Sequence, residues 1–179
     1  RHALLSRSDL LERSQGSLGR QGWAEVYARL SAADREAGLG PEDVERLALA
    51  AHLLGRDSDS MELWARAHHA FLANGDSRRA ARCASLLAVR LLLAGEMARG
   101  SGWIGRGRRL LETEQADCAE QGYLLLPIGL QFVLQRNFEA AHSAFVEAAA
   151  IAERHADPDL AALARQGQGR TLIRLGNIA

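Results

Sequence analysis

The sequence predicts an all-α protein built from stacked pairs of antiparallel helices, in units of about 40 residues. The main observation is a short turn sequence that returns at a nearly fixed interval. Its four copies begin at Gly55, Gly95, Arg136 and Gly176, so successive copies lie 40, 41 and 40 residues apart. A period in this range is typical of helical-repeat proteins, whose units stack because none can bury its apolar face alone. The second observation is that apolar residues between the turns recur three and four positions apart, which is helical spacing.

Composition sets limits on function. Hydrophobic residues make up 47% of the 179 positions, which is ample for a continuous core. All 22 basic residues are arginines, and 22 acidic residues balance them, which argues against a dedicated polyanion binder. The longest apolar stretch, residues 123–134, is shorter than the roughly 20 residues that cross a bilayer. We therefore expect no contact with a membrane.

The beginning of the chain and its two cysteines indicate a cytoplasmic protein. The first residues, Arg1-His2-Ala3, are not followed by the apolar core of a signal peptide. Cys83 and Cys118 lack a partner pattern, so we expect buried free thiols. A disulfide between them is the alternative.

We expect two regions, an N-terminal segment over residues 1–21 and a helical-repeat domain over residues 22–179. Residues 5–19 of the first region are expected to be helical. Trp23, Tyr27 and Leu30 share one helical face and predict a helix that ends near the 38–40 turn.

Further helices are predicted from turn and capping signals. Pro41 suits a first helical turn, because its missing amide is not needed there. Glu42 and Asp43 follow it, and acidic side chains near a helix N-terminus are stabilised by the positive end of the helix dipole. The predicted helices cover residues 41–54, 57–74, 77–94, 97–112, 118–135, 138–155 and 159–175.

Residues 123–128 are the weakest point of this assignment. Their composition would suit a buried strand, and Pro127 removes an amide and crowds the carbonyl four residues earlier. A lone strand would have no pairing partner in this chain. We therefore predict a helix that is kinked between Tyr123 and Pro127.

Small and large residues alternate between the turns in a specific order. In the third unit the first helix carries Leu125, Ile128, Gly129 and Phe132, and the second carries Ala141, Phe145 and Ala148. This order resembles the tetratricopeptide repeat. Trp64 with Ala67, and Ile104 with Gly100 and Gly107, fit the second-helix positions of earlier units. The resemblance implies a right-handed superhelix whose first helices line a concave groove, although the units exceed the usual 34 residues.

Several short runs resemble the helical-repeat region of actinobacterial LuxR-type transcriptional regulators. These runs are residues 51–57, 80–84, 95–98, 123–127 and 172–176. The resemblance implies an interaction or sensing surface, with DNA contacted only by a helix-turn-helix module outside this chain. The last turn, at Gly176, opens a joint whose next helix is absent from the sequence, so we interpret the chain as truncated at its C-terminal end.

The tetratricopeptide resemblance places a candidate groove on the first helix of each unit. Two interpretations stay open, because these residues could line an apolar groove or form ordinary core. The candidate groove residues are Leu49, His52, Leu53, Arg82, Val89, Leu92, Leu93, Tyr123, Leu126, Leu130, Val133 and Leu134.

Other motifs are weaker. Residues 100–105 match the glycine pattern of dinucleotide-binding proteins, but that pattern needs a preceding strand, and a helix is expected here. His52, His68, His69, His142 and His155 lack metal-ligand spacing, so we expect them on the surface or in the groove. Residues 57–60 begin like a calcium loop without its later ligands.

No residues suggest catalysis, because no nucleophile is placed near a base and an orienting group. The arginines at 78–82 and 99–109 are expected to be solvated or paired with acids. We expect no enzyme activity, cofactor or metal. The leading hypothesis is a non-catalytic domain of a transcriptional regulator that binds a peptide, partner domain or lipophilic effector in its groove. The alternative is a structural scaffold or dimerisation array without an effector site, and a homodimer fits it.

Overall fold

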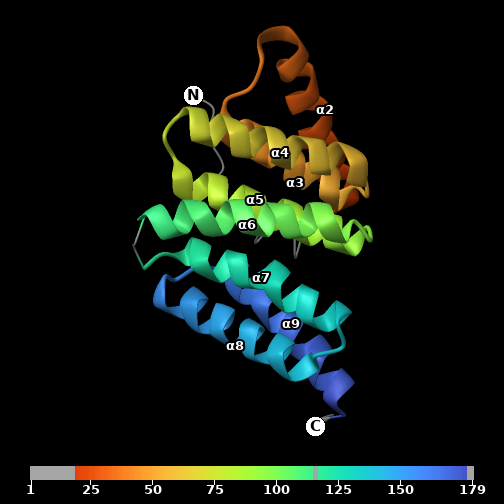
Figure 1. The fold of residues 1–179 in the computed structure, drawn as a ribbon. Helices are drawn as coiled ribbons and strands as arrows, with labels where there is room; N and C mark the ends of the chain where they lie inside the picture. Colours follow the sequence, from red (N-terminus) through yellow and green to blue (C-terminus); the bar gives the residue numbers. More distant parts are fainter. Residues whose placement is uncertain (1–18, 115–116, 177–179) are drawn as a thin grey trace. The chain divides into compact units, whose positions relative to one another are not determined.

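The computed structural model describes residues 19–114 and 117–176, and these residues form eight helices without a strand (Figure 1). The all-α prediction is therefore confirmed. The chain divides into two compact units, residues 1–63 and 64–179, and the boundary falls within one helix. The helix expected over residues 5–19 lies outside the described residues. The eight helices are α2 (Arg20–Ala37), α3 (Pro41–Leu53), α4 (Asp57–Ala73), α5 (Ser77–Leu93), α6 (Met97–Glu114), α7 (Ala119–Leu134), α8 (Phe138–Arg154) and α9 (Pro158–Leu175).

The first unit contains α2, α3 and the start of α4. Pro41 opens α3 as expected, and the buried side chains of Trp23, Val44 and Leu47 form part of the core. The Ser60 hydroxyl donates a hydrogen bond of 3.0 Å to the carbonyl of Ala48. Because this hydroxyl is buried, the bond avoids the cost of an unpaired polar group in the interior.

The second unit contains the rest of α4 and the helices α5 to α9. Helix α5 packs against α6 and α7, α7 packs against α8, and α9 packs against both α8 and α7. Short turns join α5 to α6 and α7 to α8, and Figure 1 shows both turns on the same side of this unit. The packing follows the chain order, as expected for a helical-repeat-like fold.

The four turns predicted from the sequence are confirmed by their backbone conformation. Gly55, Gly95, Arg136 and Gly176 all have positive φ, between 63° and 82°. At Arg136 the amide nitrogen bonds the Val133 carbonyl at 3.0 Å, and the next amide reaches back to Phe132 at 2.9 Å. This left-handed cap satisfies carbonyls at the helix end that would otherwise lack donors.

Helix α7 runs through Pro127, so the helix prediction for residues 123–128 is confirmed over the strand alternative. The expected kink remains a prediction, because a continuous helix can still bend at a proline.

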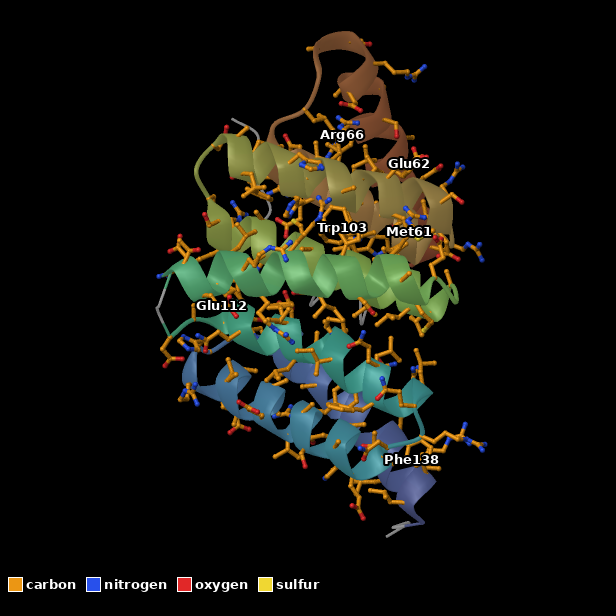
Figure 2. The ribbon with its side chains drawn as sticks, in the orientation of Figure 1. Met61, Glu62, Arg66, Trp103, Glu112 and Phe138 are labelled. Carbon is orange, nitrogen blue, oxygen red and sulfur yellow. The ribbon has the colours of Figure 1, made fainter. Side chains whose placement is uncertain are left out.

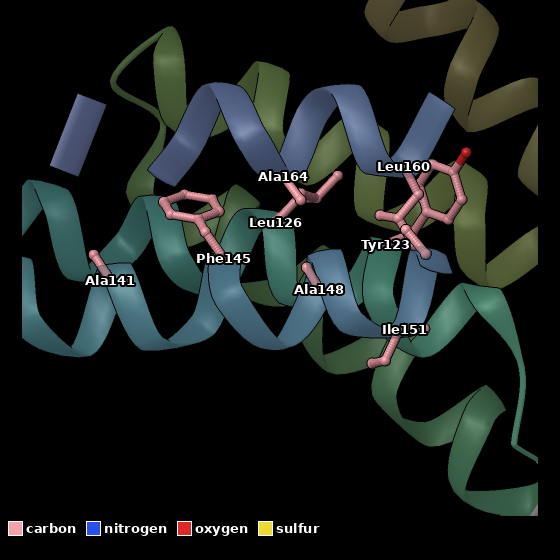
Figure 3. Close-up of a cluster of buried hydrophobic side chains, with 9 residues drawn as sticks. Tyr123, Leu126, Ala141, Phe145, Ala148, Ile151, Leu160 and Ala164 are labelled. Carbon is pink, nitrogen blue, oxygen red and sulfur yellow. The ribbon is translucent and has the colours of Figure 1, made fainter. Parts of the chain in front are cut away.

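One cluster of the second unit's core lies where α7, α8 and α9 meet, and it includes Phe145 of α8 (Figure 3). A methyl group on Gly129 of α7 would lie 2.8 Å from the Phe145 ring, and one on Gly167 of α9 would overlap it. The ring therefore occupies space that two glycines leave open. About two turns away on α7, Gly122 is packed in the same way by Ile151 and Leu160.

Ala156→Gly should raise the free energy of unfolding by about 1 kcal/mol, because Ala156 has a φ of 50°, which an L side chain disfavours. Ala150→Gly is the matched control, since Ala150 is exposed inside α8. It should lower that free energy by about 1 kcal/mol. Urea unfolding measures both changes, and equal effects would contradict the left-handed assignment.

Gly167→Ala should destabilise the protein by roughly 1–3 kcal/mol, because the new methyl displaces the Phe145 ring. Gly169→Ala, two residues later in α9, has no atom within 4 Å of the added methyl and should stabilise by about 0.5–1 kcal/mol. Chemical denaturation of the two variants tests this contrast. A destabilised Gly169→Ala or an unaffected Gly167→Ala would show that the ring is placed differently.

Candidate functional site

Four of the twelve candidate groove residues form core instead of a surface. Arg82, Leu92, Tyr123 and Leu126 are buried. The Arg82 guanidinium lies over the Tyr123 ring at 5.3 Å, and the Tyr123 hydroxyl is 3.2 Å from Oδ1 of Asp157. The Asp157 carboxylate also accepts the Asp159 and Leu160 amides and so caps α9. These side chains connect helices, and the groove interpretation is corrected for all four.

The remaining candidates in the second unit become more exposed toward the ends of α5 and α7. Val89, Leu130 and Val133 are half-buried, whereas Leu93 is 56% exposed and Leu134 is 46% exposed. Each of these leucines is the last residue of its helix. Among these candidates, the accessible apolar surface is therefore at the turns that follow α5 and α7.

An apolar residue follows each of these leucines across the turn. Met97 is exposed and opens α6, and Phe138 is half-buried and opens α8. Leu93 and Leu134 are 41 residues apart, as are Met97 and Phe138, so the same pair is repeated. We call Leu93, Met97, Leu134 and Phe138 the apolar edge. The label of Phe138 marks its position in Figure 2.

A hollow of about 390 Å³ lies beside the apolar edge, lined by residues 135–139 and by Leu175 of α9. In the first unit, a hollow of about 500 Å³ lies at the corresponding turn after α3. Two candidate residues, His52 and Leu53, line it together with Trp23, and Leu49 is half-buried one turn earlier in α3. Shallow hollows of this kind suit a protein segment better than an enclosed small molecule.

The histidine prediction needs one correction, because His68 is only 2% exposed. Its Nδ1 lies 2.8 Å from the carbonyl of Ala80, so Nδ1 carries the proton and donates. The ring meets Trp103 edge-on at a centroid distance of 4.9 Å, and Arg106 stacks on the same tryptophan at 4.8 Å. Burial lowers the pKa of His68, while the bond to Ala80 opposes that shift. Sequence reasoning missed this cluster, because its members lie on three different helices, α4, α5 and α6.

The other polar candidates have structural partners. His142 Nδ1 lies 3.1 Å from the Thr171 hydroxyl, and His155 Nε2 lies 3.2 Å from Asp117. Hydrogen bonds from His155 and Arg154 lower the pKa of the exposed Asp117 carboxyl. Within the described ranges no group of three or more potential ligands could hold a metal ion.

The glycine pattern at residues 100–105 lies inside α6, so it does not form the turn after a strand that a dinucleotide needs. Gly100 and Gly107 instead face close neighbours. A methyl on Gly100 would meet Leu92 at 2.8 Å, which confirms close packing there.

The two cysteines are free and buried, so the disulfide alternative is not realised. Burial raises the pKa of the Cys118 thiol and keeps it protonated. Among the described helices, none combines the length and apolar character needed to cross a bilayer.

Comparison with known proteins supports the fold and leaves the function open. No protein-family model matches the chain, and no curated protein matches its sequence. Among solved structures it resembles the crystal structure of BtubC (BKLC) from P. vanneervenii, with a TM-score of 0.59 and 16% sequence identity. The match covers 94% of this chain and 71% of that chain. At this identity the likeness establishes a shared helical-repeat-like fold alone.

The burial of His68 predicts a pH dependence of stability. Because burial lowers the pKa of folded His68 below the ordinary histidine value of about 6.5, the unfolded state binds the proton more readily. The contribution of neutral His68 to the free energy of unfolding is complete above about pH 6.5. It is lost as the pH falls toward the pKa of His68 in the folded state.

As the pH is lowered from neutral to mildly acidic, the free energy of unfolding should therefore fall less steeply in His68→Gln than in the unchanged protein. His69→Gln is the control, because His69 is exposed next to it. A slope that changes equally in both variants would contradict the assignment to His68.

Proposed function

We propose that this chain is a non-catalytic protein-interaction domain and that its apolar edge binds an apolar segment of a partner protein. The observation that carries this proposal is the repeated pair of apolar residues at successive turns, Leu93 with Met97 and Leu134 with Phe138. Exposed leucine and methionine side chains are unfavourable in water unless a partner covers them.

The partner is a short amphipathic helix or an extended segment with two apolar anchors. Adjacent turns present two apolar sites. A segment that contacts both gains binding free energy at each site, but it loses its translational freedom only once. Polar side chains border the edge, among them Glu96, Arg136 and Glu139, and they favour a partner that is polar on its other face.

We also propose the setting of this domain. It belongs to a cytoplasmic LuxR-type regulator whose repeats form a right-handed superhelix, and DNA is contacted by a module outside this chain. Binding at the apolar edge then controls that module. The resemblance of residues 51–57, 80–84 and 123–127 to such regulators supports this setting.

Peptides selected from a displayed library against the whole chain should carry spaced apolar anchors and bind at the apolar edge. Leu134→Ser and Leu93→Ser should each weaken their binding by about tenfold or more, because a buried leucine side chain contributes about 1.5–3 kcal/mol. Val146→Ser is the matched control, since Val146 on α8 has the same exposure of 46% as Leu134. Titration of a labelled peptide measures the dissociation constants. Equal losses in all three variants, or no selected peptide, would reject the proposal.

A further inference from the structure

The outer face of α6 carries an open strip of small residues. Ala98, Gly102, Gly105 and Arg109 follow one another at spacings of four, three and four and lie opposite the buried face of the helix. A methyl added to Gly102 would meet no atom within 4 Å, and one on Gly105 would meet only the Arg109 guanidinium at 3.6 Å. In contrast, Gly100 and Gly107 on the inner face are closely packed. The strip is therefore open at Gly102, and at Gly105 only the Arg109 guanidinium lies within 4 Å of an added methyl group.

Arginines surround this strip. Between Met97 and Leu111, α6 contains four arginines and no acidic residue. Arg99 pairs with Glu96, and Arg106 stacks on Trp103, which lies on the side of α6 that meets His68 and is labelled in Figure 2. Arg108 and Arg109 are exposed and have no carboxylate within 4.0 Å among the described residues. This face is therefore mainly positive, and the acids that α6 itself carries, Glu112 and Glu114, lie in its last turn, where Glu114 pairs with Arg78.

The outer face of α8 has the complementary pattern. Glu139, Ser143, Val146, Ala150 and Glu153 follow at spacings of four, three, four and three and are all exposed. Val146 is 46% exposed at the centre of this line, with a small residue on each side and an acid at each end. Glu147 adds a further exposed acid, and Glu153 has one distant partner, Arg165 at 3.9 Å.

We propose that two copies of this chain associate through these faces, with α6 of each copy on α8 of the other. Val146 of one copy fills the strip at Gly102 and Gly105 of its partner, and the acids of α8 meet the arginines of α6. Figure 1 shows α6 and α8 in front of α5 and α9, and both belong to the same unit. One two-fold axis can therefore make both contacts, as isologous dimers require.

A second copy fits this surface better than an unrelated acidic partner, because the same molecule supplies both the basic face and the acidic one. Residues 98–109 and residues 139–150 share a 4-3-4 spacing, and in both lines the small or apolar positions lie in the middle. The basic end of the α6 line at Arg109 and the acid of α8 at Glu153 then set the partner and the alignment.

The test is sedimentation equilibrium of the whole chain at about 50 mM salt, where surface charges are weakly screened. The unchanged chain should be dimeric, and its self-association should weaken with added salt. Arg106→Glu with Arg109→Glu should weaken self-association at least about tenfold, as should Glu139→Arg with Glu147→Arg. Mixing the two charge-reversed variants should restore a dimer, because each mixed contact again joins opposite charges.

The controls separate this proposal from the one on the apolar edge. Leu134→Ser should leave the dimer intact, whereas Val146→Ser should weaken it, which is the reverse of their expected effects on peptide binding. Circular dichroism shows that each variant is folded. A monomeric unchanged chain, reversed variants that still self-associate alone, or a mixture that stays monomeric would overturn the proposal. So would a monomer that binds a polyglutamate peptide or an RNA oligonucleotide through α6, because the face would then have another occupant.

Discussion

The second unit depends on the contact between the Phe145 ring and the glycines that face it. Gly129 of α7 and Gly167 of α9 leave no room for a methyl group beside this ring, so three helices are held by one side chain. Interiors are close-packed, and a helix can approach this closely only where the facing residue is glycine. The neighbouring alanines, Ala141 and Ala148, keep the rest of α8 near its partners (Figure 3). The order of small and large residues therefore fixes how these helices stack.

This packing leaves two kinds of surface for binding. Helices α5 and α7 pack against several other helices, and their exposed apolar residues are the last ones, Leu93 and Leu134. The outer faces of α6 and α8 are not consumed, and they differ in charge. An apolar edge and a charged outer face would recognise different chemistry, so the two surfaces can act independently. The interior holds polar groups as well, but His68 and Tyr123 are bonded to partners within the fold.

The helices and turns could be predicted from sequence because their signals are local. Gly55, Gly95 and Gly176 are residues that tolerate positive φ, and Arg136 was found by its period although its residue type disfavours that conformation.

The candidate groove was predictable only in part. Whether Arg82 or Tyr123 faces solvent depends on how far neighbouring helices rotate about their axes, and no local signal encodes that rotation. The burial of His68 was missed for the same reason. The glycines of α6 could not be told apart by residue type. Gly100 packs closely against another helix, whereas Gly102 lies on an open face.

The short turns have a consequence for how the protein folds. Among the described residues, the main contacts of helices α5 to α9 are with the next helix in the chain or the one after it. Loop closure between such neighbours costs little entropy, so a fold of this kind has a low contact order and forms quickly. The same locality means that α9 can open while the rest of the unit stays folded, because its main contacts are with α7 and α8. Amide hydrogen exchange would then proceed from the terminal helix inward, and the most protected amides would lie in α5 and α7.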